Sequence, residues 1–128
     1  MTSIKNVEVF NLENNQIKEI SGDFKDFTSN WKELFLQNNQ LKTLDPSIFR
    51  SVLVLDVFFN NINEAKFHDS QMIELAIPNN NLTLLTIGDN FEKLDVSFND
   101  RDSFFIDFKN NKKLIHLNWA GSDIKLSD

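Results

Sequence analysis

A short phrase that recurs along the chain constrains the fold more than any other feature of the sequence. Residues 12–20 read LENNQIKEI and residues 36–44 read LQNNQLKTL, with the same pair of asparagines at the same place. Alignment on the second asparagine places six segments in register: VEVFNLENNQI (7–17), WKELFLQNNQL (31–41), VLVLDVFFNNI (52–62), MIELAIPNNNL (72–82), FEKLDVSFNDR (91–101) and LIHLNWAGSDI (114–124). Such internal repetition predicts a solenoid, in which each unit buries its apolar face only against its neighbours.

The spacing of the repeats is short and slightly irregular. The aligned positions follow one another at steps of 24, 21, 20, 19 and 23 residues. We therefore expect one domain over residues 1–128, built from six repeats with the boundaries 7–30, 31–51, 52–71, 72–90, 91–113 and 114–128.

Each repeat contains two apolar residues separated by one polar position, which is the periodicity of a half-buried strand. Neighbouring strands at about 4.8 Å would form a parallel sheet with these residues pointing into a continuous core. The predicted inward pairs are Phe10 and Leu12, Leu34 and Leu36, Leu55 and Val57, Leu75 and Ile77, Leu94 and Val96, and Leu117 and Trp119.

The aligned asparagines come directly after these strands, where the chain must turn. An asparagine side chain has two N–H donors and one carbonyl acceptor, so at a buried bend it can satisfy the backbone of its own turn and of the next coil. We expect a ladder of such side chains, while the preceding asparagine lies at the exposed rim. The predicted ladder consists of Asn15, Asn39, Asn60, Asn80 and Asn99, with Ser122 at the corresponding place in the sixth repeat, which we expect to be irregular.

The six segments resemble the leucine-rich repeat pattern L-x-x-L-x-L-x-x-N-x-L over nearly the whole chain. The resemblance implies an α/β-type solenoid that is mostly β, with a parallel sheet on its concave face. The return segments are too short for long helices, so irregular, extended or 3₁₀ structure is expected there. The stretch LKTLDPSIF (41–49) is similar to the return segment of extracellular members, and NNLTLLTIGDNFEKLDVSFND (80–100) to secreted mosquito immune proteins.

Those insect proteins bind complement-like thioester proteins and carry C-terminal cysteines followed by coiled coils. This chain has no cysteine, so the resemblance is to a middle portion of the solenoid. The absence also excludes disulfides and thiolate metal sites, and favours a cytosolic protein or a fragment cut between cysteine-bearing caps. Neither a leader peptide nor a stretch long enough to cross a membrane is visible.

Charge and residue types argue against several functions. A net charge of −6 disfavours nucleic-acid binding, which usually needs a basic face. The two histidines, His68 and His116, lie in separate repeats without a nucleophile beside them, so we expect no catalytic, cofactor-binding or metal-binding residues. The triplet Asn81-Leu82-Thr83 is an N-glycosylation sequon at the end of a predicted strand.

The outward positions of neighbouring strands combine aromatic and acidic residues. An apolar anchor within a polar rim is typical of a protein-binding surface, and the predicted set is Phe35, Val54, Asp56, Phe58, Phe59, Pro78 and Asp95. Two other interpretations remain open: the next coil could half-bury Phe59 and Phe98, or the patch could be an intramolecular contact cut in a fragment.

The sequence therefore predicts a non-catalytic module that binds a partner protein through the concave sheet face, in extracellular innate immune recognition. The alternatives are an intracellular scaffold or adaptor, or a fragment of a longer repeat protein. Copies of the chain could also associate through sheet edges or the apolar patch. The compartment follows the same division: extracellular for a fragment of a secreted protein, cytoplasmic otherwise.

Overall fold

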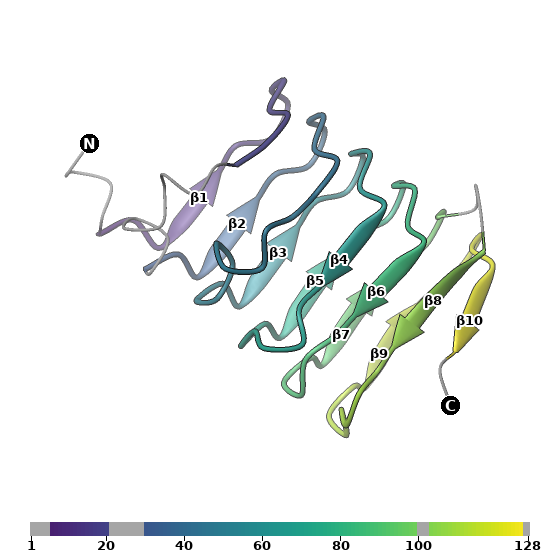
Figure 1. Cartoon of the computed structure of the whole chain (residues 1–128). Helices are drawn as coiled ribbons and strands as arrows, with labels where there is room; N and C mark the ends of the chain where they lie inside the picture. The colour runs from purple at the N-terminus through teal and green to yellow at the C-terminus, as the bar shows by residue number, and fades with distance from the viewer. Residues whose placement is uncertain (1–5, 21–29, 100–102, 127–128) are drawn as a thin grey trace.

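A computed structural model describes residues 6–20, 30–99 and 103–126, and all structural statements below refer to these residues. One strand from each repeat joins a six-stranded parallel sheet, which forms the rear layer in Figure 1. Its order is β1-β2-β3-β5-β7-β9, so each strand pairs with that of the next repeat. The strands are β1 (Val9–Asn11), β2 (Glu33–Phe35), β3 (Val54–Asp56), β5 (Glu74–Ala76), β7 (Lys93–Asp95) and β9 (His116–Asn118).

The return segments of the later repeats form a second parallel sheet, the front layer in Figure 1. Its order is β10-β8-β6-β4, and its strands are β4 (Glu64–Lys66), β6 (Leu84–Thr86), β8 (Phe104–Asp107) and β10 (Ile124–Leu126). The predicted fold class is confirmed: the chain is a parallel-strand solenoid of about five turns, with almost no helix. The expected extended returns are paired with one another from the third repeat onward.

The core lies between the two sheets. Leu34, Leu55 and Leu75 are buried at equivalent positions of three paired strands, because the registers align them one beside another. Phenylalanines fill the space under the turns: the Phe67 ring lies 6.1 Å from that of Phe49 and 6.4 Å from that of Phe91. A sheet on each face spaces the later repeats equally on both sides, which limits the curvature of the solenoid.

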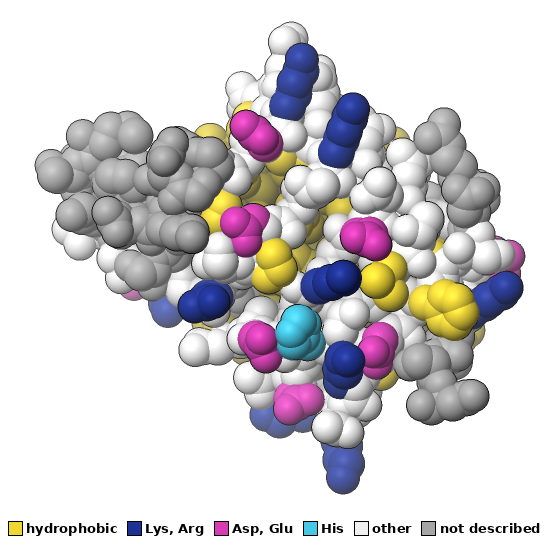
Figure 2. All heavy atoms as spheres, viewed as in Figure 1, with side chains coloured by type: hydrophobic (Ala, Val, Ile, Leu, Met, Phe, Trp, Pro, Cys, Tyr) yellow, Lys and Arg dark blue, Asp and Glu magenta, His cyan; other side chains and the backbone are white. Residues whose placement is uncertain are grey.

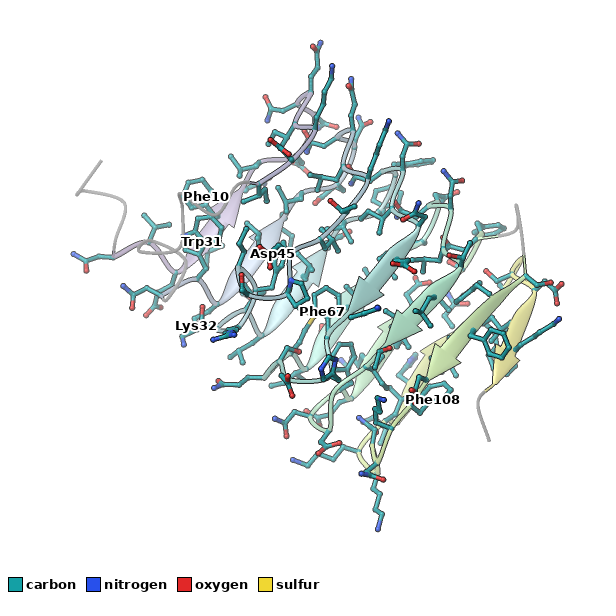
Figure 3. The ribbon with its side chains drawn as sticks, viewed as in Figure 1. Phe10, Trp31, Lys32, Asp45, Phe67 and Phe108 are labelled. Carbon is teal, nitrogen blue, oxygen red and sulfur yellow. The ribbon has the colours of Figure 1, made fainter. Side chains whose placement is uncertain are left out.

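The second repeat returns differently. Asp45 accepts hydrogen bonds from the backbone and the hydroxyl of Ser47, and turns follow through residue 51. Only a bridge between Thr43 and Glu64 links this return to the second sheet. At the same end of the molecule, the Phe10 and Trp31 rings lie 5.2 Å apart (Figure 3).

The sixth repeat differs from its predicted structure in two ways. Its strand is regular, since β9 pairs with β7 in the register of the other repeats. However, Leu117 and Trp119 do not reach a buried position: they are 36% and 46% exposed, although the equivalent Leu94 and Val96 are buried. The reason is that β9 is the last strand of the six-stranded sheet, so no coil in the described part of the chain covers them.

Candidate functional site

The outer face of the six-stranded sheet carries a shallow groove of about 380 Å³. It runs across five neighbouring strands, from β2 to β9. Ala76 stands between Asp56 and Asp95 in the paired register, and its small side chain leaves room between the two carboxylates. The side chains along the groove are those of Phe35, Val54, Asp56, Glu74, Ala76, Lys93, Asp95, His116 and Asn118.

The two aspartates of the groove are held by the turn that follows each strand. The backbone N–H of Phe58 donates to Asp56 Oδ1 at 3.1 Å, and that of Ser97 donates to Asp95 Oδ1 at 2.9 Å. Asn118 makes the same bond to the N–H of Ala120 at 3.1 Å. This position therefore closes a local Asx turn, and it accepts Asp and Asn alike.

Acidic groups make the groove electrostatically unfavourable for a further negative charge. Burial raises the pKa of Asp56 above its ordinary value of 3.8, and the charges of Asp95 and Glu13 raise it further, whereas the Phe58 hydrogen bond lowers it. Elsewhere in the groove Lys93 lies 3.5 Å from Glu74. Positive charge brought between Asp56 and Asp95 would relieve their repulsion.

Phenylalanines lie along the edge where the strands of this sheet end. The Phe58 and Phe59 rings are 4.6 Å apart, and Phe59 and Phe98 are 52% and 53% exposed. We call Phe58, Phe59 and Phe98 the aromatic edge. The interpretation in which the next coil half-buries Phe59 and Phe98 remains open, because about half of each residue is covered and Gly121 of the next coil lies against the Phe98 ring.

Phe59 and Phe98 also have an unusual backbone. Their φ angles are +54° and +55°, in the left-handed region that bulky residues rarely adopt. The equivalent residues of the other repeats share this conformation, and they are Asn14, Asn38, Asn79 and Gly121, the residue types that tolerate it best. The turn requires the left-handed conformation in every repeat, and Phe59 and Phe98 adopt it at a cost in free energy.

The remaining predicted binding residues are divided. Phe35 and Val54 are half-buried and line the groove with Asp56 and Asp95. The prediction for Pro78 is wrong as a surface anchor, because Pro78 is buried. Pro78 lies just after β5, beside the turn that follows β3. The N–H of Phe59 in that turn donates to the Pro78 carbonyl at 3.2 Å, which holds the turn against Pro78.

The asparagines of the turns form a connected series. The side chain of Asn39 donates to the carbonyls of Leu36 and of Leu12 in the preceding coil, both at 3.0 Å, and accepts the N–H of Ile17 at 3.0 Å. Asn60, Asn80 and Asn99 are buried and repeat this pattern. The partner is the preceding coil, rather than the next coil that the sequence suggested.

The two ends of the series differ from its middle. Asn15 is exposed and donates only within its own turn, to Leu12 and Glu13, since no described coil precedes it. Ser122 replaces the amide with one hydroxyl, which accepts the N–H of Asn99 at 2.9 Å and donates to Val96 at 2.8 Å.

One structural residue escaped the sequence analysis. Asn111 donates to the carbonyls of Gly88 and Phe91, at 2.8 and 3.0 Å, and accepts the N–H groups of Lys113 and Leu114. Asn111 links the turn before β7 to the turn before β9, just as the asparagine ladder links the turns that follow the strands of the six-stranded sheet. The signal was weak, because Asn111 lies outside the six aligned segments.

The predicted sequon is not among the residues that line the groove. Asn81, the sequon residue, is half-buried, and its backbone N–H is bonded to Ile62. Figure 2 shows the opposite face, where basic, acidic and hydrophobic side chains alternate over the four-stranded sheet. Within the described ranges, no three His, Asp or Glu side chains are placed to hold a metal ion, and no helix could span a membrane.

Comparison with known proteins agrees with the fold. Residues 5–49 match the model of a family described as leucine-rich repeats (2 copies), and the match supports a place for the chain in that family. A search of curated proteins found no match. The family match also supports a protein-interaction module.

Proposed function

We propose that this leucine-rich repeat solenoid is a non-catalytic module that binds a partner protein through the groove and the adjoining aromatic edge. The observation that carries the proposal is the presence of two exposed phenylalanines, Phe59 and Phe98, in left-handed turns. The family match supports the general role.

Phe59 and Phe98 adopt their backbone conformation at a cost in free energy. A left-handed conformation costs a bulky L-residue roughly 1–2 kcal/mol relative to the right-handed region. The rings recover part of this through contacts with Phe58 and Gly121, but about half of each side chain remains in water. Strain and apolar exposure at the same residue are typical of sites where the surface serves binding.

The groove suggests the chemistry of the partner segment. Phe35, Val54 and Ala76 offer an apolar surface, while Asp56 and Asp95 place negative charge on either side of Ala76. A segment with an arginine or lysine next to an apolar side chain would satisfy both features, since the cation relieves the repulsion between the carboxylates.

Binding can be tested with a double variant, Phe59→Asn and Phe98→Asn, which keeps residues suited to the left-handed turns. Quantitative proteomic capture on immobilised protein should lose a specific set of partners that the unmodified chain enriches. Phe105→Asn is the matched control, because Phe105 is 51% exposed but belongs to the four-stranded sheet. Equal capture by all three proteins would contradict the proposal.

The finer role in extracellular immune recognition also belongs to this proposal. It is supported by the resemblance of residues 80–100 to secreted insect repeat proteins and by the sequon at Asn81. Expression through a secretory pathway should give a chain whose mass falls on removal of N-glycans, and Asn81→Gln should abolish the difference. A chain secreted without glycan would remove the sequon from the argument, and retention in the cytosol of its own cells would favour the scaffold alternative.

A further inference from the structure

The C-terminal end of the solenoid leaves the edges of both sheets unpaired in the described structure. β9 is the last strand of the six-stranded sheet, and β10 is the last strand of the other (Figure 1). Ile115, which precedes β9, is 77% exposed, and Leu117 on β9 and Trp119 directly after it are 36% and 46% exposed. An edge strand with apolar side chains is a ready template for pairing with another strand.

Hydrogen bonding shows which groups of β9 face outward. The carbonyl of Asn118 accepts the N–H of Val96 at 2.8 Å, and the N–H of His116 reaches the Glu92 carbonyl at 3.1 Å. Since alternate residues of a strand direct their backbone groups to opposite sides, Leu117 directs its N–H and C=O away from β7. Leu117 is thus the natural centre of any new pairing.

We propose that the chain forms a two-fold dimer in which β9 pairs antiparallel with β9 of a second copy, centred on Leu117. This register sets each Leu117 opposite the other and each Ile115 opposite Trp119 of the second copy. It sets His116 opposite Asn118, so no like charges face each other within the strand. The apolar residues of the end are thereby covered by the same residues of the second copy, as a two-fold contact requires.

The charges around β9 favour the antiparallel direction. Lys112 and Lys113 precede the strand and Asp123 follows the turn after it. Antiparallel pairing brings the start of one β9 to the end of the other, so the lysines of each copy approach Asp123 of its neighbour. A parallel contact between β9 and β1 of another copy would instead build an open filament.

The first test is the mass of the unmodified chain in solution. Sedimentation equilibrium should show a monomer–dimer equilibrium, and Leu117→Glu should weaken it by more than about tenfold, because the register places two carboxylates side by side. Phe105→Glu, a change of equal charge on the other sheet, should leave it unaltered. A monomer at every concentration up to about 100 µM, or assemblies that grow without limit, would overturn the proposal.

The register has its own test, since the chain contains no cysteine. Leu117→Cys should form an intermolecular disulfide on mild oxidation, because directly opposed residues of an antiparallel pair lie about 5.5 Å apart between Cα atoms. Trp119→Cys alone should not, because its two copies would be roughly 13 Å apart along the strands. Mixing Ile115→Cys with Trp119→Cys should restore cross-linking. Efficient cross-linking of Trp119→Cys alone would refute this register.

Discussion

The side-chain amide of Asn60 donates to the carbonyl of Leu36, 24 residues earlier, at 3.0 Å. The same side chain accepts the N–H of Leu41 at 2.9 Å and donates to Val57 in its own turn at 3.0 Å. One buried residue thus satisfies backbone groups of two coils. Because each coil contacts only its neighbours, such bonds contribute to the order of the stack as well as to the turn.

Replacing Asn60 should therefore be costly. Asn60→Ala removes the acceptor of the buried Leu41 N–H and one of the two amide donors to the Leu36 carbonyl, which keeps Asn39, and we expect a loss of about 3 kcal/mol in the free energy of unfolding. Urea denaturation followed by circular dichroism measures this loss. Asn15→Ala is the control: its side chain is exposed and bonds only its own turn, so the loss should stay below about 1 kcal/mol. Equal losses at both sites would show that the link between coils adds no stability.

Gly121 and Phe98 offer a second test of packing at the turns. Gly121 has a φ of +68°, and a β-carbon added there would lie 2.6 Å from the nearest carbon of the Phe98 ring. Gly121→Ala should lower the free energy of unfolding by roughly 1–2 kcal/mol through backbone strain and this clash. Adding Phe98→Asn removes the clash and leaves the strain. The double variant should recover part of the loss in a double-mutant cycle, and strictly additive effects would show that the ring does not restrict position 121.

Sequence reasoning recovered the features that depend on one repeat and its neighbour. The alternation around Leu34, Leu55 and Leu75 placed the strands, and the fold class followed from their stacking. The same alignment carries a second signal, for backbone conformation. Four of the six residues before the ladder are Asn or Gly, which marks the position as left-handed and would have identified Phe59 and Phe98 as strained.

Other features depend on interactions that the sequence does not state. Residues 62–67, 82–87 and 104–108 contain apolar residues without strict alternation, and the pairing of these returns into a second sheet requires equal spacing on both faces. The exposure of Leu117 and Trp119 depends on what stacks beyond β9, which no pattern within the repeat encodes. Pro78 occupies an outward position of its repeat, but the neighbouring turn encloses it, and this contact is not encoded in the pattern of one repeat.

The aromatic edge should be separable from stability. Phe59→Asn relieves roughly 1–2 kcal/mol of backbone strain and loses a ring contact with Phe58 of about 0.5–1.5 kcal/mol, so the free energy of unfolding should change by less than about 1 kcal/mol. Asn79→Phe, the reverse change at an equivalent position, should cost roughly 1–2 kcal/mol. Thermal melting monitored by circular dichroism distinguishes these outcomes. If Phe59→Asn destabilises the protein as strongly as Phe67→Asn in the core, by more than about 3 kcal/mol, the ring is structural.

Asp56 should make stability depend on pH in a direction opposite to that of a salt-bridged carboxylate. Because burial raises its pKa in the folded protein above the ordinary value of 3.8, the folded state binds the proton more tightly than the unfolded state. The free energy of unfolding therefore falls as the pH rises from the ordinary pKa through the raised one, and the penalty is complete above it. Asp56→Asn removes the charge and keeps the turn, since Asn118 accepts the equivalent N–H. The variant should be more stable than the unmodified chain at pH 7 and equal to it below about pH 3, as measured by urea denaturation across this range. A variant that is less stable at pH 7 would mean that the carboxylate stabilises the fold, and the acidic groove would then owe its charge to structure rather than to binding.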